Sequence, residues 1–446
     1  MKDMTKGNPT GLILGFAIPM LIGNIFQQIY NVVDTIIVGR YLGEDALAGV
    51  GSTGTLTFFL LALVAGLCNG AGLVIAQCVG SKDTQKLKEA VVALVWTAGI
   101  MTAIVSILGL SCSKFFLMLL SVPDNVIDYS TEYLTIIYTF VIGSVIYNGA
   151  SSILRSTGDS RTPLIALIAG SLLNVVLDIV FIVEFNMGVA GAAYATILSQ
   201  LLSALICVTY LIKKRKYIGL TAINWQPNKE AVMLIIKTGF PSAFQSCMIS
   251  LGGMSVQKLV NSYGSSVMAA YVAANRIDSI AIQVIVSIGT ALSVFTGQNM
   301  GQNNFKRIHD GLRKTLVMMM LASISIAILV LVFRYELMSV FLDSDTSEEA
   351  TSIGSTYLSI ICIAYVIAGI MQSYQNVIRG AGDVNTCMVA GLTELAGRIV
   401  FAYLLSVGFK LGPTGIWIAT PISWGCGCVI PVVRYYSGKW KLKKLV

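Results

Sequence analysis

Long apolar segments separated by short polar ones run along the whole chain. Segments of about 20 mostly apolar residues, the length of a helix that crosses a bilayer, recur from residue 12 to residue 437. The pattern therefore predicts twelve membrane-spanning helices. They cover residues 12–38, 47–78, 90–112, 131–154, 162–184, 189–212, 231–255, 266–295, 312–333, 354–378, 387–408 and 414–437.

The second half of the chain repeats the skeleton of the first, with matching positions about 221 to 224 residues apart. The first copy contributes Pro19, Gln77, Gly80, Arg155, Gly158, Asp159, Thr162, Gly188, Gly191, Ala195 and Thr196, and the second contributes Pro241, Gln298, Gly301, Arg379, Gly382, Asp383, Thr386, Gly412, Gly415, Ala419 and Thr420. Since six predicted spans fall in each copy, both copies enter the bilayer with the same orientation. We expect an all-α integral membrane protein whose twelve transmembrane helices form two parallel, pseudo-symmetric six-helix bundles.

The two predicted lobes are joined by a polar connector. It spans Lys213–Glu230, begins with four consecutive basic residues and contains Pro227. We therefore place the N-terminal lobe at residues 1–215, a cytoplasmic linker at 216–230 and the C-terminal lobe at 231–446.

Composition and charge support a membrane location. Hydrophobic residues make up 55% of the chain and charged residues 12%, which is too few polar groups to cover a water-soluble protein of 446 residues. With both termini in the cytoplasm, 23 of the 30 Lys and Arg residues lie on predicted cytoplasmic segments and 5 on outer segments. We expect a multi-pass protein of the cell (inner) membrane. Its net charge of +8 is then explained by topology and contact with anionic lipid, without nucleic-acid binding.

Three polar residues within apolar segments distinguish the first copy from the second. They are Asp34, Asn174 and Asp178. Because an ionisable side chain in a membrane-spanning helix costs free energy and usually marks an ion or substrate path, we expect the chemistry to lie in the first copy. The second copy has Val256, Arg398 and Ala402 at the corresponding positions.

The first predicted helix carries a polar stripe on one face. In hydrocarbon each unsatisfied amide would cost several kcal/mol, roughly, so this stripe cannot face lipid. It must face a polar helix through interhelical hydrogen bonds or line a water-accessible cavity, and its terminal carboxylate favours the cavity. The stripe consists of Asn24, Gln27, Gln28, Asn31, Asp34 and Thr35.

Oxygen-bearing side chains of the first copy suit a small hard cation or a shared proton. Asn174 and Asp178 stand four residues apart and project from one helix face, and Thr196 follows on the next helix. If Asp34 joins them, the two carboxylates cannot both stay ionised in low dielectric without a bound cation. The alternative is that one aspartate pairs with a basic side chain, but the first six predicted helices offer no interior Lys or Arg.

The second copy contains charged residues of its own. Glu394 and Arg398 stand four residues apart, so we expect them to form a structural ion pair. Arg276 and Asp278 are two residues apart and do not face each other, which leaves open whether they line a cavity of the second lobe.

Several motifs resemble those of the multidrug and toxic compound extrusion (MATE) transporters. The segment Arg155–Asp159 and its echo Arg379–Asp383 are similar to the ends of that family's fourth and tenth helices. The first helix and the loop after it also resemble the family, and the resemblance extends over essentially the whole chain. The residues that carry it there are Pro19, Gln28, Tyr30, Asn31, Asp34, Val38, Gly39, Gly43, Ala46, Leu47, Ala48, Val50 and Gly51.

The resemblance implies a cation site of the kind found in the DinF-like branch of that family. It assigns Asp34, Asn174, Asp178 and Thr196 as ligands of Na⁺ or as the proton site. It also implies a hinge at Pro19, where a missing backbone hydrogen bond predicts a kink that either moves or stays fixed. The NorM-like branch instead uses acids on helices 7 and 10, and residues 241–255 and 354–378 contain none.

The implied function is secondary active antiport, in which amphipathic, often cationic organic compounds are exported in exchange for H⁺ or Na⁺. Gln27, Tyr30 and Asn31, beside Asp34, are the candidate wall of the substrate cavity. The expected partners are these small molecules and the lipid bilayer, with no nucleic acid and no cofactor beyond the coupling ion. We expect the protein to act as a monomer.

Three rival functions are possible. A lipid-linked oligosaccharide flippase of the same superfamily would need a more cationic central cavity, for which only Arg276 and Arg398 are available. A major-facilitator transporter would show nested repeats of three helices, and none is found. An enzyme would need a nucleophile with a base or a metal cluster, whereas the lone His309 lies in a predicted loop, and no Walker-type phosphate loop is present.

The sequence yields a first testable prediction. Asp34→Asn and Asp178→Asn are each expected to abolish drug efflux from cells while leaving expression intact, because each removes one carboxylate of the pair. Glu394→Gln should retain efflux. Normal efflux in both aspartate variants would refute the site assignment.

Overall fold

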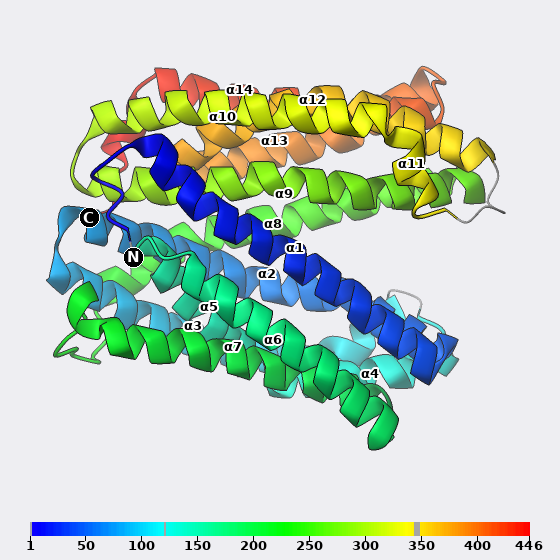
Figure 1. Ribbon diagram of the computed structural model, residues 1–446, viewed down its shortest axis with the longest axis horizontal. Coiled ribbons are helices and arrows are strands. Elements are labelled where there is room, and N and C mark those ends of the chain that lie inside the picture. The colour runs from blue at the N-terminus through cyan, green and yellow to red at the C-terminus, as the bar shows by residue number, and fades with distance from the viewer. Residues whose placement is uncertain (1, 120–121, 343–347) are drawn as a thin grey trace. The chain divides into compact units, whose positions relative to one another are not determined.

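The described part of the chain is helical throughout (Figure 1). The computed structural model describes residues 2–119, 122–342 and 348–446. The α-helices are α1 (Pro9–Leu42), α2 (Glu44–Ser81), α3 (Thr84–Leu119), α4 (Asp124–Thr139), α5 (Ile142–Ser156), α6 (Arg161–Asp178), α7 (Gly188–Ile218), α8 (Lys229–Asn261), α9 (Ser265–Gly301), α10 (Phe305–Val332), α11 (Arg334–Ser339), α12 (Glu348–Gly380), α13 (Val384–Tyr403) and α14 (Pro413–Tyr436). Two π-helical segments, η1 (Ile179–Glu184) and η2 (Leu404–Gly408), extend α6 and α13, and a 3₁₀ turn, η3 (Lys439–Leu442), follows α14.

The helices confirm an all-helical membrane protein. Within the described residues, eleven helices are long and apolar enough to cross a membrane, and α4 with α5 forms a twelfth candidate span that bends by 51°. Thr131, Thr135 and Thr139 each donate a hydroxyl hydrogen bond to the carbonyl four residues earlier, and α4 ends at Thr139. Such bonds compete with the helix's own hydrogen bonds and favour bending, which accounts for a break inside the predicted span 131–154.

Backbone packing divides the chain into two compact units. Unit 1 is built mainly from Pro19–Ala243, and unit 2 from Met4–Ile18 and Phe244–Leu445. The divisions fall within α1 at Pro19 and within α8 just after Pro241, not in the predicted linker 216–230. α1 and α8 therefore each contribute a segment to both packing units, a pairing that chain order alone does not show.

Within unit 1, α2 and α8 approach each other at backbone distance. A Cβ atom on Gly66 would collide with the backbone of Ala243, and one on Gly70 would collide with the backbone of Gly239. Small residues four apart on both helices are the pattern that lets membrane helices pack closely without bulky side chains. The close packing of α2 against α8 therefore requires glycine at positions 66 and 70.

The repeated glycine of each copy has a conformational reason. Gly158 has φ +83° and Gly382 has φ +102°, a region that side chains with Cβ rarely adopt. Gly158 accepts a hydrogen bond from the backbone N–H of Lys2, and Gly382 packs against the backbone of Lys443. The loop at Gly158 thus contacts Lys2 within unit 1, and the loop at Gly382 contacts Lys443 within unit 2.

The close packing of α2 and α8 gives a stability prediction. Gly70→Ala should destabilise the protein by about 1–3 kcal/mol, because the added methyl group meets backbone atoms that cannot move aside easily. Gly51→Ala is the matched control on the same helix, since its Cβ would enter open space. Thermal unfolding in detergent should show a lower Tm for Gly70→Ala and an unchanged or higher Tm for Gly51→Ala. Equal Tm values for the two variants would contradict this packing argument.

Candidate ion-binding site

Two carboxyl groups meet in unit 1 between α1 and the end of α6. Asp178, the last residue of α6, is fully buried, and Asp34 of α1 is partly buried. Their carboxyl groups lie within hydrogen-bonding reach of each other. Such a contact is favourable only when one group carries a proton or a cation lies between them.

Asn174 ties this pair to α7. Its amide, oriented by its neighbours, donates from Nδ2 to Asp178 Oδ2 at 2.9 Å and accepts at Oδ1 from the backbone N–H of Thr196 at 3.2 Å. Asn174 is itself fully buried, one helical turn before Asp178. Three α-helices, α1, α6 and α7, therefore converge at one point through polar contacts.

Acceptor oxygens at this point remain available to an ion. Asp34 Oδ1, Asp178 Oδ1 and Thr196 Oγ1 are buried and make no hydrogen bond to the protein. Buried oxygens of this kind require a proton, a cation or water, because leaving them unpaired costs free energy. Carboxylate and hydroxyl oxygens are the donors that a hard monovalent cation accepts.

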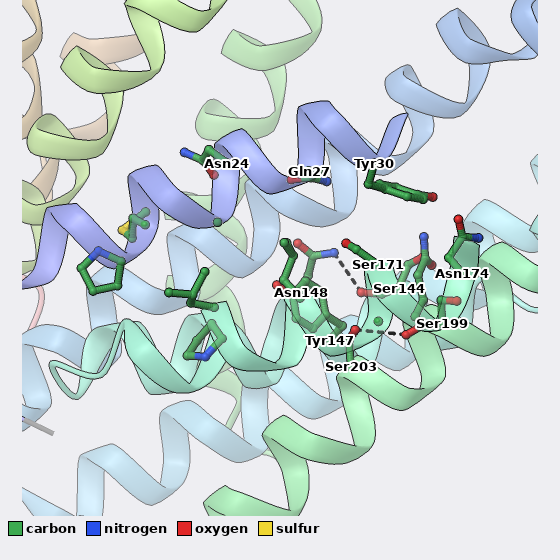
Figure 2. A pocket seen from close by; sticks show the side chains of 18 of the residues that line it. Asn24, Gln27, Tyr30, Ser144, Tyr147, Asn148, Ser171, Asn174, Ser199 and Ser203 are labelled. Carbon is green, nitrogen blue, oxygen red and sulfur yellow. Dashed lines mark hydrogen bonds between the residues drawn. The ribbon is translucent and has the colours of Figure 1, made fainter. Parts of the chain in front are cut away.

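A polar cavity of about 250 Å³ approaches the acids along α1, α5, α6 and α7 (Figure 2). Tyr30 and Asn174 lie at the end next to the acids, each one turn before an aspartate, whereas Pro19 and Arg155 line the other end. Drug-sized pockets measure about 300–1,000 Å³, so this volume fits water and ions better than a whole organic substrate. The cavity thus provides a polar route to the acids.

An apolar layer closes the opposite side of the acids. Ile37, Val38, Ile182 and Ala192 form one buried cluster. Ile37 and Val38 follow Asp34 by three and four residues, and Ile182 follows Asp178 by four. Ala192 precedes Thr196 by four. Each therefore lies one turn away from a site residue, on the same face of its helix. Tyr133 packs against this cluster, so aliphatic side chains and one tyrosine border the acids on this side.

The structure separates the residues predicted for the substrate wall. Gln27 and Tyr30 line the cavity, together with Asn24. Asn31 does not line it; its side chain is exposed, and its carbonyl accepts a hydrogen bond from Thr35 Oγ1 at 2.7 Å. Helix phase does not account for the difference, because at 100° per residue position 31 lies within about 40° of positions 24 and 27.

Two further polar ridges that the sequence interpretation missed also line the cavity. Their signal was the recurrence of polar residues every three or four positions within apolar helices. Arg155 also corrects the expectation that the first six helices hold no interior basic residue, although it lies at the end away from the aspartates. The ridges are Ser144, Tyr147 and Asn148 on α5, and Ser199, Gln200 and Ser203 on α7.

Unit 2 holds a different set of charged groups. The predicted ion pair is present, with Arg398 Nη2 3.4 Å from Glu394 Oε1. Asp278 is buried and accepts hydrogen bonds from Tyr365 at 2.9 Å and Tyr357 at 3.4 Å, while Arg276 is exposed. Asp278 is therefore held by tyrosine hydroxyls, and no carboxyl group of the described residues is hydrogen-bonded to it.

The π-helical segments occur in both copies. η1 follows Asp178 directly and η2 begins two residues after Ala402, the residue that the repeat aligns with Asp178. A wider turn at this place is often associated with functional sites. Here it belongs to the duplicated fold, because it persists where the aspartate is absent.

Comparisons with known proteins agree over nearly the whole chain. A model of the MatE family matches residues 19–180 and again residues 241–404, and these segments begin at prolines paired by the internal repeat. Probable multidrug resistance protein YoeA of Bacillus subtilis (strain 168) is 30% identical over 439 residues, covering 96% of this chain and 94% of that protein. Probable multidrug resistance protein YpnP of the same strain is 31% identical over 444 residues, covering 99% and 98%.

A solved structure shows the same fold. It is described as the outward-facing conformation of a multidrug resistance MATE family transporter of the MOP superfamily. It superposes with a TM-score of 0.90 at 25% sequence identity and covers 100% of this chain and 99% of its own.

The contact between the two aspartates predicts a pH-dependent stability. Raising the pH removes the proton that the pair shares and leaves two negative charges in one buried space, so Tm should fall from mildly acidic to mildly alkaline buffer. Asp178→Asn should lose most of this dependence, while Glu394→Gln should keep it. A Tm profile that is the same in wild type and Asp178→Asn would contradict the contact.

Proposed function

The chain belongs to the MatE family, and from this premise we propose that it is a secondary multidrug exporter that exchanges organic compounds for H⁺ or Na⁺. The family comprises transporters, not enzymes. The observation that carries the proposal is the meeting of Asp34 and Asp178 between a polar cavity and an apolar layer. This arrangement suits an ion that must enter and leave by a controlled route.

The coupling ion acts on the repulsion between the two carboxylates. Two like charges about 4 Å apart repel by about 4 kcal/mol at an effective dielectric constant of about 20. At about 1.4 kcal/mol per tenfold change, this repulsion shifts a two-state equilibrium several hundredfold. Binding one proton or one Na⁺ removes the repulsion and holds α1 against α6, and releasing it favours separation of the two helices.

The orientation of the Asn174 amide suits protons and sodium ions differently. With its nitrogen toward Asp178, the amide stabilises a negative or half-protonated pair. Asn174 becomes a ligand of a sodium ion only if its amide turns, so that Oδ1 faces the carboxylates and the N–H of Thr196 loses its acceptor. Both ions are compatible with the oxygen ligands of Asp34, Asp178 and Thr196.

The substrate and the ion act on the same helix. Gln27 and Tyr30 stand on α1 two turns and one turn, respectively, before Asp34, and both face the cavity. In the proposed mechanism an organic compound contacts these side chains when α1 has moved away from α6, which is the position that ion release favours. Antiport requires that the ion bind one position of α1 more tightly and that the substrate bind the other position more tightly. Pro19, which marks the division between the packing units, is the proposed hinge.

We assign the chain to the DinF-like branch of the family because its acid pair lies on α1 and α6. Residues 241–255 of α8 and 354–378 of α12, where the NorM-like branch carries acids, contain none. Both termini are proposed to be cytoplasmic in the cell membrane, consistent with the bias of Lys and Arg. A monomer is the proposed working form, since every ligand of the site comes from one unit.

Transport by the purified protein in lipid vesicles tests this function. Efflux of an organic cation such as ethidium should be driven by an imposed Na⁺ or pH gradient and should stop when an ionophore collapses that gradient. ATP should have no effect. Movement of the dye that is indifferent to both gradients would contradict antiport.

A further inference from the structure

A second, apolar cavity lies in unit 1, on the opposite face of α5 from the ion-binding site. It occupies about 740 Å³ between α3, α5, α7 and the connector residues 220–225. These helices pack together in unit 1 (Figure 1). It shares no lining residue with the polar cavity, and aliphatic side chains form most of its wall. The volume lies within the range of pockets that hold small molecules.

The cavity is a groove that opens toward lipid. Val95, Ile146 and Ile212 line it and are between 40% and 58% exposed, as apolar side chains in membrane-spanning helices are when they contact acyl chains. Along α3 the lining runs from Val91 to Thr102, which is about 16 Å at 1.5 Å per residue. One leaflet contributes about 15 Å, half of a hydrocarbon core of about 30 Å. The groove therefore has the length of one leaflet.

A folded connector builds one end of the groove. Gly219, with φ +86°, turns the chain back after α7, and the side chain of Leu220 is buried. Trp96 Nε1 of α3 then donates a hydrogen bond to the carbonyl of Trp225 at 2.9 Å. A second bond, from Asn228 Nδ2 to Glu89 Oε2 at 2.8 Å, fixes the connector to the first turns of α3.

Two basic side chains stand at this same end. Arg215 and Lys216, in the last turn of α7, line the groove, and none of its lining residues in the described part of the chain is a carboxylate. Lys213 and Lys214 precede them but lie outside the lining. Basic residues directly beyond a membrane-spanning helix attract anionic lipid, and tryptophans such as Trp96 and Trp225 favour the bilayer interface.

We propose that this groove is a binding site for an anionic phospholipid. One acyl chain fills the aliphatic slot, and the headgroup phosphate binds Arg215 and Lys216 beside the connector. In the proposed orientation the lipid comes from the cytoplasmic leaflet. The site is separate from the exchange of substrate and ion, and a cationic substrate is a poor occupant because the two basic residues repel it.

Native mass spectrometry of the full-length protein in detergent tests the site. Wild type should retain one phosphatidylglycerol more tightly than one phosphatidylcholine of the same chain length. Arg215→Gln with Lys216→Gln should weaken phosphatidylglycerol binding about tenfold and remove this preference. Lys213→Gln with Lys214→Gln is the matched control, because it removes the same charge from the same turn and should keep the preference.

A second variant tests the apolar slot independently of charge. Gly149→Leu should displace both lipids, since a Cβ at this groove position meets open space and a larger side chain fills the slot. Gly425→Leu on α14, where a Cβ also meets open space, should retain them. Elution as a single sharp peak in size exclusion confirms that each variant is folded.

Three results would overturn the proposal. The first is equal retention of the two lipids by wild type, which would indicate non-specific lipid contact. The second is an equal loss of preference in both double variants, which would indicate a diffuse charged surface. The third is binding of the organic cation tetraphenylphosphonium to the groove. If Gly149→Leu abolishes this binding and Arg215→Gln with Lys216→Gln preserves it, the groove is a site for organic cations.

Discussion

The contact between the carboxyl groups of Asp34 and Asp178 is the constraint on which the account of this protein depends. It brings two acids from α1 and α6 into one buried space, where they are stable together only with a proton or a cation. The remaining features are arranged around this requirement. Asn174 and Thr196 fix the third helix, the polar cavity gives access, and the apolar layer at Ile182 limits access from the other side.

The duplicated skeleton and the single site are explained by different parts of the sequence. Positions that recur in both copies, such as Gly158 and Gly382, set backbone conformation and packing. Positions that do not recur set chemistry: the second copy has Ala402 where the first has Asp178, although both copies have the same π-helical turn nearby. One fold duplicated in sequence therefore supports one proposed ion site, and in unit 2 the buried Asp278 instead accepts hydrogen bonds from tyrosine hydroxyls.

The parts of the structure that depend on local spacing were predictable from sequence. Hydropathy gave the spans, and a four-residue spacing placed Asn174 and Asp178 on one face. The features that depend on packing between distant segments could not be predicted from sequence. Nothing local divides α1 at Pro19 between two packing units, brings the Trp225 carbonyl to Trp96, or excludes Asn31 from the cavity. The polar ridges of α5 and α7 had a visible period, but serine and asparagine in helices are common enough to be attributed to packing.

The most direct test of the central claim is the number of ions that the aspartate pair holds. Purified protein in weakly buffered detergent, monitored with a pH indicator and a sodium electrode, should release about one H⁺ or one Na⁺ per chain when an organic cation binds. Asp34→Asn and Asp178→Asn should release none, even where the organic cation still binds. Release of the same number of ions by these variants as by wild type would contradict the account.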